Sequence, residues 1–276
     1  MQATGLALVQ AMSDTLSLSS EFTVGLPHLD IYTLSEDFAL AHSMEYHWSL
    51  LASSLGLKSS QWYDRKGERM YAAAIYLSTW FDLDNPISED AVCLARTEVL
   101  AIRKPHALSK TQYLVDGTCR AEVRLLTSFV KRQRAGSNKK LSVTQDIWLE
   151  QDFGSDKIDA LLEEHHNAKS RPDAGDVQST TEINQIQDFN AANLLYFKNF
   201  VRIAKAAEWG QNRGRPPQLN MSRDCYYYGN ADDGERIDTR IARGAGQGQT
   251  SHQTADGKRI FLSLWTARDI LLKHPV

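Results

Sequence analysis

Asparagine side chains that can orient a substrate carbonyl group occur in the second half of the chain. Asn190 and Asn193 lie near the predicted start of a helix, and Asn230 follows a predicted strand. Backbone N–H groups in the first turn of a helix can also hold a developing negative charge, so the helix starts at Ser35 and at Asn190 are candidate oxyanion sites. Structural roles compete with this interpretation, because Asn190 suits an N-cap and Asn230 suits a turn.

Metal binding has weak support in the sequence. His165 and His166 are adjacent, and adjacent side chains on a helix point in different directions, so the pair does not form a metal site by itself. Cys93, Cys119 and Cys225 show no C-x-x-C spacing and are expected to be buried free thiols. We therefore expect no metal and no redox cofactor.

The composition is that of a globular protein, with 42% hydrophobic and 24% charged residues among 276. A formal net charge of −3 argues against nucleic-acid binding, and the basic stretches 131–134 and 139–140 are expected to be a solvated turn. No apolar run approaches the ~18 residues that cross a bilayer, and residues 1–20 lack the Lys or Arg of a secretory signal. We expect no membrane partner and a cytoplasmic location.

The first element that must position these groups is a helix beginning at Ser35. Ser35 is a suitable N-cap and Gly56 suits the C′ position. Strands are predicted to follow over residues 70–80, 91–102 and 121–130. The helix is recognised by one apolar stripe at three- and four-residue intervals, formed by Leu34, Phe38, Ala41, Met44, Trp48, Leu51 and Leu55.

Residues 150–181 are predicted to be a linker or long surface loop, because this part of the chain contains few apolar residues together with Pro and Gly. The helix pattern then begins again. Asp188 or Asn190 can cap a second helix that ends at Gly210, and strands are expected over 221–229, 236–242 and 258–266. The inward face of this helix is predicted to be Leu194, Phe197, Val201 and Ala204.

The order of elements in the two halves coincides, with a capped helix, a polar spacer, an aromatic strand and further strands. Repeated order with weak identity indicates an internal duplication, and a duplicated helix-on-sheet unit gives a two-layer α+β architecture. One long helix wrapped by an antiparallel sheet is the hot dog arrangement. We therefore predict a double hot dog protein, with units at 1–149 and 182–276, as a monomer or a homodimer.

Two protein families resemble parts of this chain. Residues 188–197 resemble the helix start of acyl-CoA thioesterases of the 4-hydroxybenzoyl type, with Ala191 and Ala192 near the place of that family's histidine. Nearly the whole chain resembles the double hot dog family that includes the bifunctional acyltransferase/decarboxylase of the leinamycin polyketide pathway. The matching segments are 25–29 (GLPHL), 34–36 (LSE), 46–48 (YHW), 69–72 (RMYA), 188–197 and 227–230 (YYGN).

The wider resemblance implies a reaction at a tyrosine hydroxyl. A malonyl or methylmalonyl group from CoA acylates the tyrosine and is decarboxylated, and the acetyl or propionyl group then passes to the phosphopantetheine of an acyl carrier protein. The implied tyrosine is Tyr71, with Tyr63 and Tyr76 as alternatives. A phenol with a pKa of about 10 must lose its proton to act as a nucleophile, so His47 or His28 is the expected base, although His47 also suits a helix surface.

Two other functions compete with this one. An acyl-CoA or acyl-carrier thioesterase would use Asp188 as base or nucleophile and water as the acceptor, and a non-catalytic protein would only bind the acyl carrier. A dehydratase is disfavoured, because no histidine has the H-x-x-x-G-x-x-x-x-P context and because Asp37 and His42 lie on different faces of a helix. The expected substrate contacts are Ser35, His28, Asp188, Asn190, Asn193 and Asn230.

Overall fold

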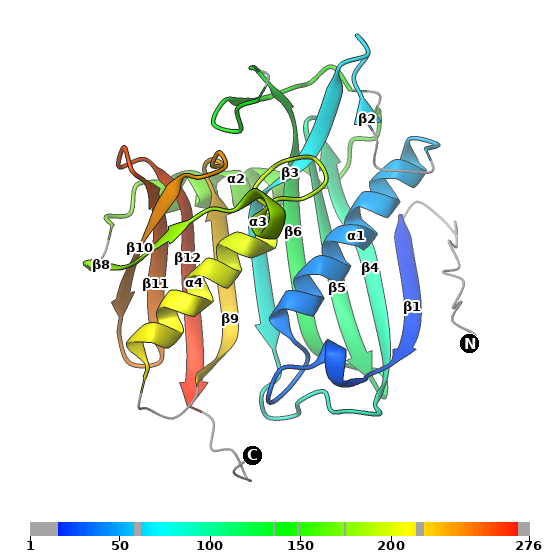
Figure 1. The fold of residues 1–276 in the computed structure, drawn as a ribbon. Helices are drawn as coiled ribbons and strands as arrows, with labels where there is room; N and C mark the ends of the chain where they lie inside the picture. Colours follow the sequence, from blue (N-terminus) through cyan, green and yellow to red (C-terminus); the bar gives the residue numbers. More distant parts are fainter. Residues whose placement is uncertain are drawn as a thin grey trace. The chain divides into compact units, whose positions relative to one another are not determined.

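A computed structural model describes residues 16–57, 62–134, 136–147, 149–173, 175–213 and 218–269. The chain forms two compact units. Unit 1 comprises the residues up to Lys131 together with Ser142–Glu163, and unit 2 comprises Arg132–Leu141 together with the residues from Glu164 onward. Each unit places one long helix against an antiparallel sheet (Figure 1). These are two hot dog units in one chain, which confirms the predicted α+β fold class.

Unit 1 has α1 (Glu36–Ser54) on one face of its sheet. The strands follow the order β1 (Ser17–Thr23), β4 (Val92–Arg103), β5 (His106–Val115), β6 (Thr118–Arg132) and β3 (Arg69–Phe81). The 3-10 helix η1 (Leu26–His28) precedes α1, β2 (Trp62–Tyr63) pairs with the start of β3, and β7 (Leu141–Val143) follows β6 along the chain.

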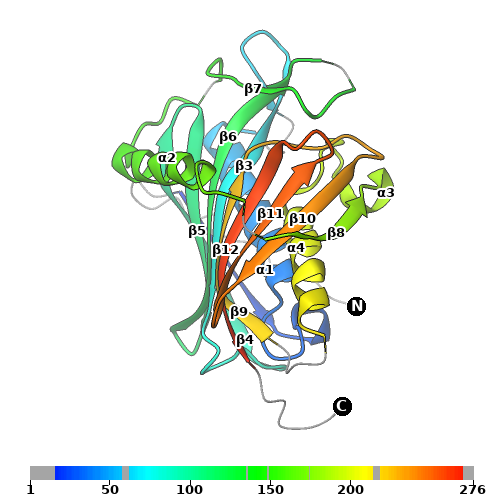
Figure 2. The same cartoon turned by 90° about the vertical axis from the view of Figure 1, so that its left-hand side faces the viewer.

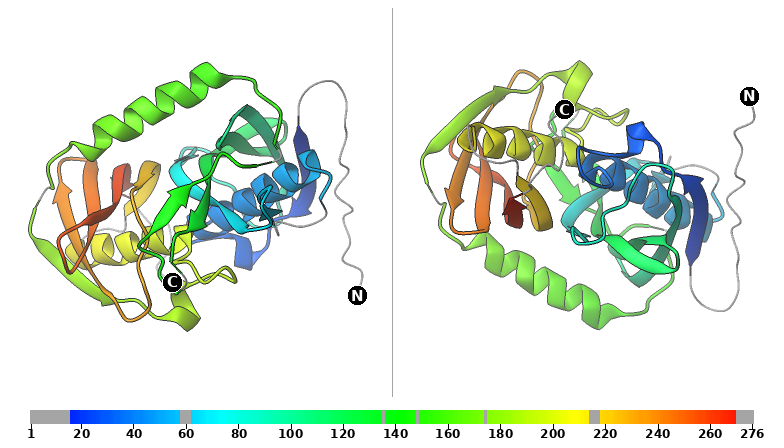
Figure 3. Two further views of the ribbon diagram at one scale, coloured as in Figure 1. Left: turned by 90° about the horizontal axis from the view of Figure 1, so that it is seen from above. Right: turned by 90° about the horizontal axis from the view of Figure 1, so that it is seen from below.

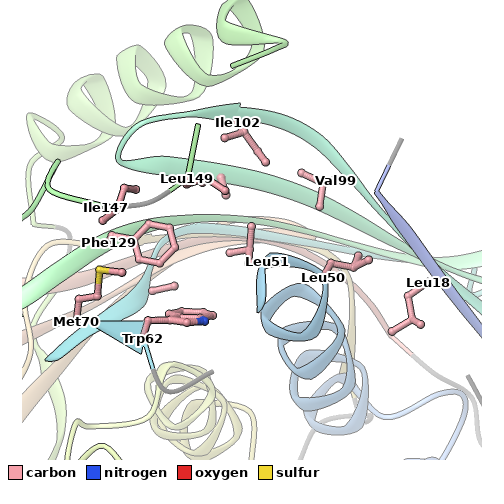
Figure 4. Close-up of a cluster of buried hydrophobic side chains, with 12 residues drawn as sticks. Leu18, Leu50, Leu51, Trp62, Met70, Val99, Ile102, Phe129, Ile147 and Leu149 are labelled. Carbon is pink, nitrogen blue, oxygen red and sulfur yellow. The ribbon is translucent and has the colours of Figure 1, made fainter. Parts of the chain in front are cut away.

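The core of unit 1 is a cluster of apolar side chains between α1 and the sheet (Figure 4). Leu50 and Leu51 come from α1, while Met70 and Phe129 come from two adjacent strands. Trp62 of β2 packs edge-on against Phe129, with ring centroids 5.2 Å apart. Because full burial of one such side chain contributes roughly 1.5–3 kcal/mol, this cluster fixes the position of α1 on β3 and β6.

The buried face of α1 is rotated relative to the predicted stripe. Two polar residues, Ser43 and His47, lie on the buried face. The helix ends at the predicted place, where Gly56 takes a left-handed φ of 67°. Polar residues on the buried face escape a search for apolar periodicity. Four residues that were predicted to face inward are only partly buried: Phe38, Ala41, Trp48 and Leu55.

Unit 2 repeats the arrangement with α4 (Phe197–Gln211), preceded by the short α3 (Gln185–Asp188). Phe200 of α4 packs edge-on against Tyr227 at a centroid distance of 5.4 Å, so Tyr227 faces the helix. By alternation, Tyr226 and Tyr228 lie on the other face, as the sequence predicts. The strands follow the order β9 (Gln218–Tyr227), β12 (Arg259–Asp269), β11 (Gln247–Thr254), β10 (Arg236–Arg243) and β8 (Val177–Glu182).

The segment 150–181, predicted to be a linker, contains α2 (Ser155–Lys169) and most of β8. The first turns of α2 belong to unit 1, where α2 and α1 lie on opposite faces of the sheet (Figures 2 and 3). Ile158 is fully buried, and Asp159 pairs with Arg103. A mostly polar helix that buries only a few side chains carries little apolar periodicity, so the sequence pattern did not reveal it.

Five further strands were absent from the prediction: β1, β2, β5, β7 and β11. In β11, the sequence QGQTSHQT has no aliphatic or aromatic hydrophobic residue, yet Thr250, Ser251 and His252 are buried. Thr250 and His252 have partners on neighbouring elements: Oγ1 of Thr250 donates to Glu208, and the Thr239 hydroxyl lies 3.0 Å from Nδ1 of His252. Hydrogen bonding of this kind depends on tertiary structure and leaves no alternating pattern of hydrophobic residues in the sequence.

Candidate functional site

The loop between α3 and α4, residues 189–196, is built around the side chain of Asn190. Its Oδ1 accepts hydrogen bonds from the N–H groups of Ala192 at 3.0 Å and Leu194 at 3.2 Å. Phe189 and Leu195 form a backbone bridge across the loop. Asn190 therefore closes a turn ahead of the helix and does not act as its N-cap.

Helix α4 consequently begins later than predicted, at Phe197 with Tyr196 as the N-cap. Asn193 takes a left-handed φ of 55°, which a right-handed helix does not accommodate, and its Oδ1 accepts a hydrogen bond from Nε2 of Gln185 at 2.6 Å. The side chain of Tyr196 does not cap the helix. The first turn of α4 contains no acidic residue and includes Lys198, so the local charge adds to the positive end of the helix dipole.

Asp188 braces the same region from inside the protein. Its carboxylate is buried, with Oδ1 accepting from Nη2 of Arg202 at 2.5 Å and Oδ2 accepting from the N–H of Asn184 at 2.9 Å. Its carbonyl oxygen accepts from Nδ2 of Asn199 at 2.9 Å. The geometry of Asp188 is that of an ion-paired structural carboxylate, with both oxygens engaged by protein donors.

Two further side chains fix the loop between α3 and α4. Oδ1 of Asn230 accepts from the N–H of Leu195 at 3.0 Å, and Nδ2 of Asn230 donates to the carbonyl oxygen of Leu195 at 3.1 Å. Nη2 of Arg132 donates to the carbonyl oxygens of Ala192 at 2.5 Å and Asn193 at 2.9 Å. Four of the six expected substrate ligands, Asp188, Asn190, Asn193 and Asn230, are thus brought together here, and their hydrogen bonds hold the loop in place. The other two, Ser35 and His28, lie in unit 1.

Unit 1 uses a similar device in the loop between η1 and α1, residues 29–35. Oδ1 of Asp30 accepts hydrogen bonds from the N–H groups of Tyr32 and Thr33, both at 2.9 Å. Leu29 and Leu34 form a backbone bridge across the loop, as Phe189 and Leu195 do in unit 2. The matching construction supports the internal duplication.

The start of α1 differs from that of α4 in its charges. Ser35 is the N-cap, but its side chain makes no capping bond, and its N–H donates to the carbonyl oxygen of His28 at 2.8 Å. Glu36 and Asp37 occupy the first turn. Glu36 is buried and accepts a hydrogen bond from Oγ1 of Thr79 at 3.1 Å. Two carboxyl groups in this turn oppose the binding of a further negative charge.

His28, one of the two expected bases, is held at the β1 side of unit 1. Its Nδ1 accepts a hydrogen bond from the N–H of Gly25 at 2.9 Å. Its ring packs against Phe22 of β1 at 5.1 Å and against Phe38 of α1 at 4.7 Å between centroids. Strand β3, which carries Tyr71, is at the other end of the strand order in this unit, so the structure does not bring His28 to Tyr71.

His47, the other expected base, is a fully buried residue on the inner face of α1 and is not a surface residue. Its Nδ1 lies 2.8 Å from Oγ of Ser109, and its Nε2 lies 2.8 Å from Oγ1 of Thr127. Burial lowers the pKa of His47 to about 3, so the ring is neutral near pH 7. Both ring nitrogens form hydrogen bonds to hydroxyl groups in the core, and the ring lies on the face of the sheet that α1 covers.

Tyr71 lies on the other face of β3. Met70 and Ala72 pack into the core beside α1, and successive side chains of a strand alternate between faces. Tyr71 is partly buried, and the guanidinium of Arg69 lies 5.7 Å from the centre of its ring. The alternatives differ in exposure, because Tyr63 is 47% exposed and Tyr76 is 5% exposed. His47 and Tyr71 are therefore separated by the sheet.

A buried charged cluster in unit 2 was missed by the sequence analysis. The guanidinium of Arg223 on β9 donates to both carboxylate oxygens of Glu208 on α4, at 3.0 and 2.8 Å. Oγ1 of Thr250 donates to Glu208 as well, at 2.7 Å. The available signal was Glu208 itself, which lies on the same helix face as Val201 and Ala204, at the expected three- and four-residue spacing.

Within the part of the chain that the structure describes, no group of three or more His, Cys, Asp or Glu side chains is arranged to hold a metal ion. The three cysteines are free thiols; Cys93 and Cys225 are buried, and Cys119 is partly buried. Among the described helices, none is both long enough and apolar enough to cross a membrane.

No protein-family model matches the sequence, and no curated protein matches it. Solved structures do share the fold. A 12:0-ACP thioesterase from Umbellularia californica aligns with a TM-score of 0.66 and 9% identity, over 92% of this chain and 98% of that one. A protein described as an oleoyl thioesterase from Lactobacillus plantarum gives 0.63 and 10%, over 96% and 100%. An acyl-ACP thioesterase from Bacteroides thetaiotaomicron gives 0.61 and 11%, over 91% and 98%.

Proposed function

We propose that this protein is an enzyme that cleaves acyl thioesters carried on CoA or on an acyl carrier protein, as an acyl-thioesterase does. The observation that carries the proposal is the double hot dog architecture, which spans both units and is shared with solved acyl-ACP thioesterases over more than nine-tenths of the chain. The resemblance of residues 188–197 to thioesterase helix starts supports the same class of substrate.

Within this proposal the thioester carbonyl binds at the start of α4. Attack on the carbonyl carbon places negative charge on its oxygen, and helix N–H groups stabilise that charge when they are fixed in advance. The braces from Asn190, Asn230 and Arg132 supply this rigidity. Lys198 adds positive charge to the first turn of α4, whereas the first turn of α1 carries Glu36 and Asp37. The electrostatics therefore favour α4 over α1.

The acceptor decides between hydrolysis and transfer. In hydrolysis, water adds to the carbonyl carbon, the C–S bond breaks, the thiolate leaves and is protonated, and a free acid is formed. The ion pair between Asp188 and Arg202 makes Asp188 a positioning residue in this scheme, because its carboxylate is already bonded on both oxygens.

A second candidate function is acyl transfer with decarboxylation through Tyr71, as the family resemblance implies. The observation that favours it is the location of Tyr71 on the face of β3 away from the core, beside the guanidinium of Arg69. A cation in this place attracts the carboxylate of a malonyl group.

The test is incubation of the full chain with straight-chain acyl-, malonyl- and methylmalonyl-CoA, with and without a holo carrier protein. Thiol release and intact mass of both proteins are then measured. Free acid with released thiol is the expected result for a thioesterase. The second candidate function would instead give an acetyl- or propionyl-carrier protein. Absence of turnover on every thioester, with substrate binding retained, would contradict both and leave an acyl-carrier-binding protein.

Two substitutions make the test specific. Tyr71→Phe removes only a hydroxyl and abolishes the acyl-enzyme mass and the transfer product if Tyr71 is the nucleophile. Tyr63→Phe, at the 47% exposed tyrosine of β2, is the matched variant and abolishes them instead if Tyr63 is the nucleophile. Asp188→Asn keeps an acceptor for the N–H of Asn184. We expect it to retain turnover at reduced stability, and complete loss of turnover in a folded variant would make Asp188 the catalytic base after all.

A further inference from the structure

Residues 132–140, RQRAGSNKK, carry four cations and no acidic residue. They form a basic hairpin that belongs to unit 2 and is closed by a hydrogen bond from the N–H of Gln133 to the carbonyl oxygen of Lys140, at 2.9 Å. Composition alone suggests a solvated turn. The structure shows in addition that this hairpin is fastened to the same loop that precedes α4.

One end of the basic hairpin is anchored directly. Nη2 of Arg132 donates to the carbonyl oxygens of Ala192 and Asn193, and Nε of Arg132 donates to Oδ1 of Asn138 at 3.1 Å within the hairpin. The guanidinium therefore links the hairpin to the turn that fixes the start of α4. The three acceptors are neutral oxygens.

The other end is anchored through the turn after β9. Nδ2 of Asn138 donates to the carbonyl oxygen of Ala231 at 3.2 Å, and the N–H of Asn138 donates to Oδ1 of Asp232 at 2.5 Å. Lys139 forms an ion pair with Glu235. This turn begins at Asn230, whose side chain holds the backbone of Leu195, so the basic hairpin, the turn and the start of α4 form one bonded assembly.

Two cations of the basic hairpin, Arg134 and Lys140, differ from the other two. Both residues are exposed, and neither side chain forms an ion pair with the residues that the structure describes. Exposed cations near a reacting group raise the local concentration of an anionic ligand and can bind it. Guanidinium and ammonium groups are the usual protein partners of phosphate.

We propose that Arg134 and Lys140 bind the phosphate of the phosphopantetheine arm that presents the acyl thioester to α4. The proposal rests on the proposed function, since this phosphate is present both in CoA and in a holo carrier protein. In this proposal unit 2 has two binding regions. The start of α4 binds the carbonyl group, and the basic hairpin binds the handle, by which we mean the thiol-bearing group (CoA or the carrier's phosphopantetheine) to which the acyl chain is attached.

The experiment compares one acyl group on three handles: CoA, holo carrier protein, and pantetheine without phosphate. The double variant Arg134→Ala/Lys140→Ala is compared with the full wild-type chain. The matched control is Arg213→Ala. Arg213 is exposed and follows the C-terminal end of α4, and because this 15-residue helix is about 22 Å long, Arg213 is far from its start. We expect KM to rise roughly tenfold on a phosphate-bearing handle with kcat unchanged, and the pantetheine substrate and the control variant to be unaffected.

A loss on both CoA and the carrier protein, or on the only one of the two that the wild-type chain accepts, supports the proposal. If the wild-type chain accepts both, a loss confined to one of them overturns it, because the shared phosphate is present in both. An equal loss on pantetheine, or no loss on either phosphate-bearing handle, overturns it. Direct binding of CoA and holo carrier protein by calorimetry keeps the test separate from turnover. If the wild-type chain binds these ligands without cleaving any thioester, the proposed function fails while the hairpin is still tested by the affinity of the double variant.

Discussion

Helices α1 and α4 carry different buried polar residues at the same position of the helix. Counted from Glu36, His47 is residue 12 of α1, and counted from Phe197, Glu208 is residue 12 of α4. His47 is neutral and bonded to Ser109 and Thr127, whereas Glu208 is charged in an ion pair with Arg223 and accepts a further bond from Thr250. The two helices thus place a buried polar residue at the same position, but the residue is neutral in unit 1 and charged in unit 2.

The two loops ahead of the helices show the same relation. Asp30 and Asn190 each accept two backbone N–H groups and close a similar turn, so the backbone device does not require a charge. Asp30 nevertheless adds a carboxyl group where α1 already has Glu36 and Asp37. Duplication preserved the framework, while the charges at the helix starts diverged. Under the proposed function, this difference favours the start of α4 for binding the carbonyl group.

The largest effect is expected from breaking the buried pair that distinguishes unit 2. Arg223→Met leaves the Glu208 carboxylate buried without its cation, and we expect a loss of about 3–5 kcal/mol in the free energy of unfolding. Arg223→Met/Glu208→Leu removes both charges and should recover most of that loss. Chemical denaturation measures both, and Arg236→Met is the control, because Arg236 and its partner Glu182 are both exposed and the change should cost about 1 kcal/mol or less. A double variant no better than the single one would contradict this account.

The next effect tests the buried histidines through pH. Burial lowers the pKa of His47 to about 3 and that of His252 in unit 2 to about 4. Because the unfolded chain binds these protons below its ordinary histidine pKa of about 6.5 and the folded chain does not, stability falls as pH decreases from that value toward about 3–4.

Between pH 7 and pH 5 each of these histidines should cost about 2 kcal/mol of unfolding free energy. His47→Gln should remove that share of the pH dependence for unit 1 and leave the share of His252 in place. Denaturation curves of the wild type and the variant at both pH values give the difference in slope. Parallel losses in the two proteins would show that His47 is protonated in the folded state.

The smallest effect is expected from exchanging the charge at the helix starts. Lys198→Glu gives the first turn of α4 an acidic residue, as Glu36 and Asp37 do in α1. A helix-terminal charge is worth roughly 0.3–1 kcal/mol, so kcat on an acyl thioester should fall by roughly twofold to fivefold. Asp37→Asn in α1 is the control and should leave kcat unchanged. A fall of equal size in that control would place the reacting carbonyl at α1.

The sequence predicted the two helices and several strands where a buried apolar face repeats at helical or strand spacing. It did not predict α2 or β11, because few or none of their residues are the large apolar ones that make such a pattern. For the candidate site, the sequence identified Asp188, Asn190 and Asn230 as a group. It did not distinguish ligands from braces, since that depends on Arg202, Leu195 and other partners distant in the chain.

The sequence by itself determined the double hot dog architecture, because apolar periodicity and repeated element order are local properties that survive without knowledge of contacts. Only the tertiary structure decided the state of each polar side chain. His47 became a neutral core residue because β5 and β6 supply hydroxyl groups beside both of its nitrogens. Asp188 became a brace because Arg202 lies against it. The charge and availability of a buried group follow from its partners, and those partners are chosen by packing.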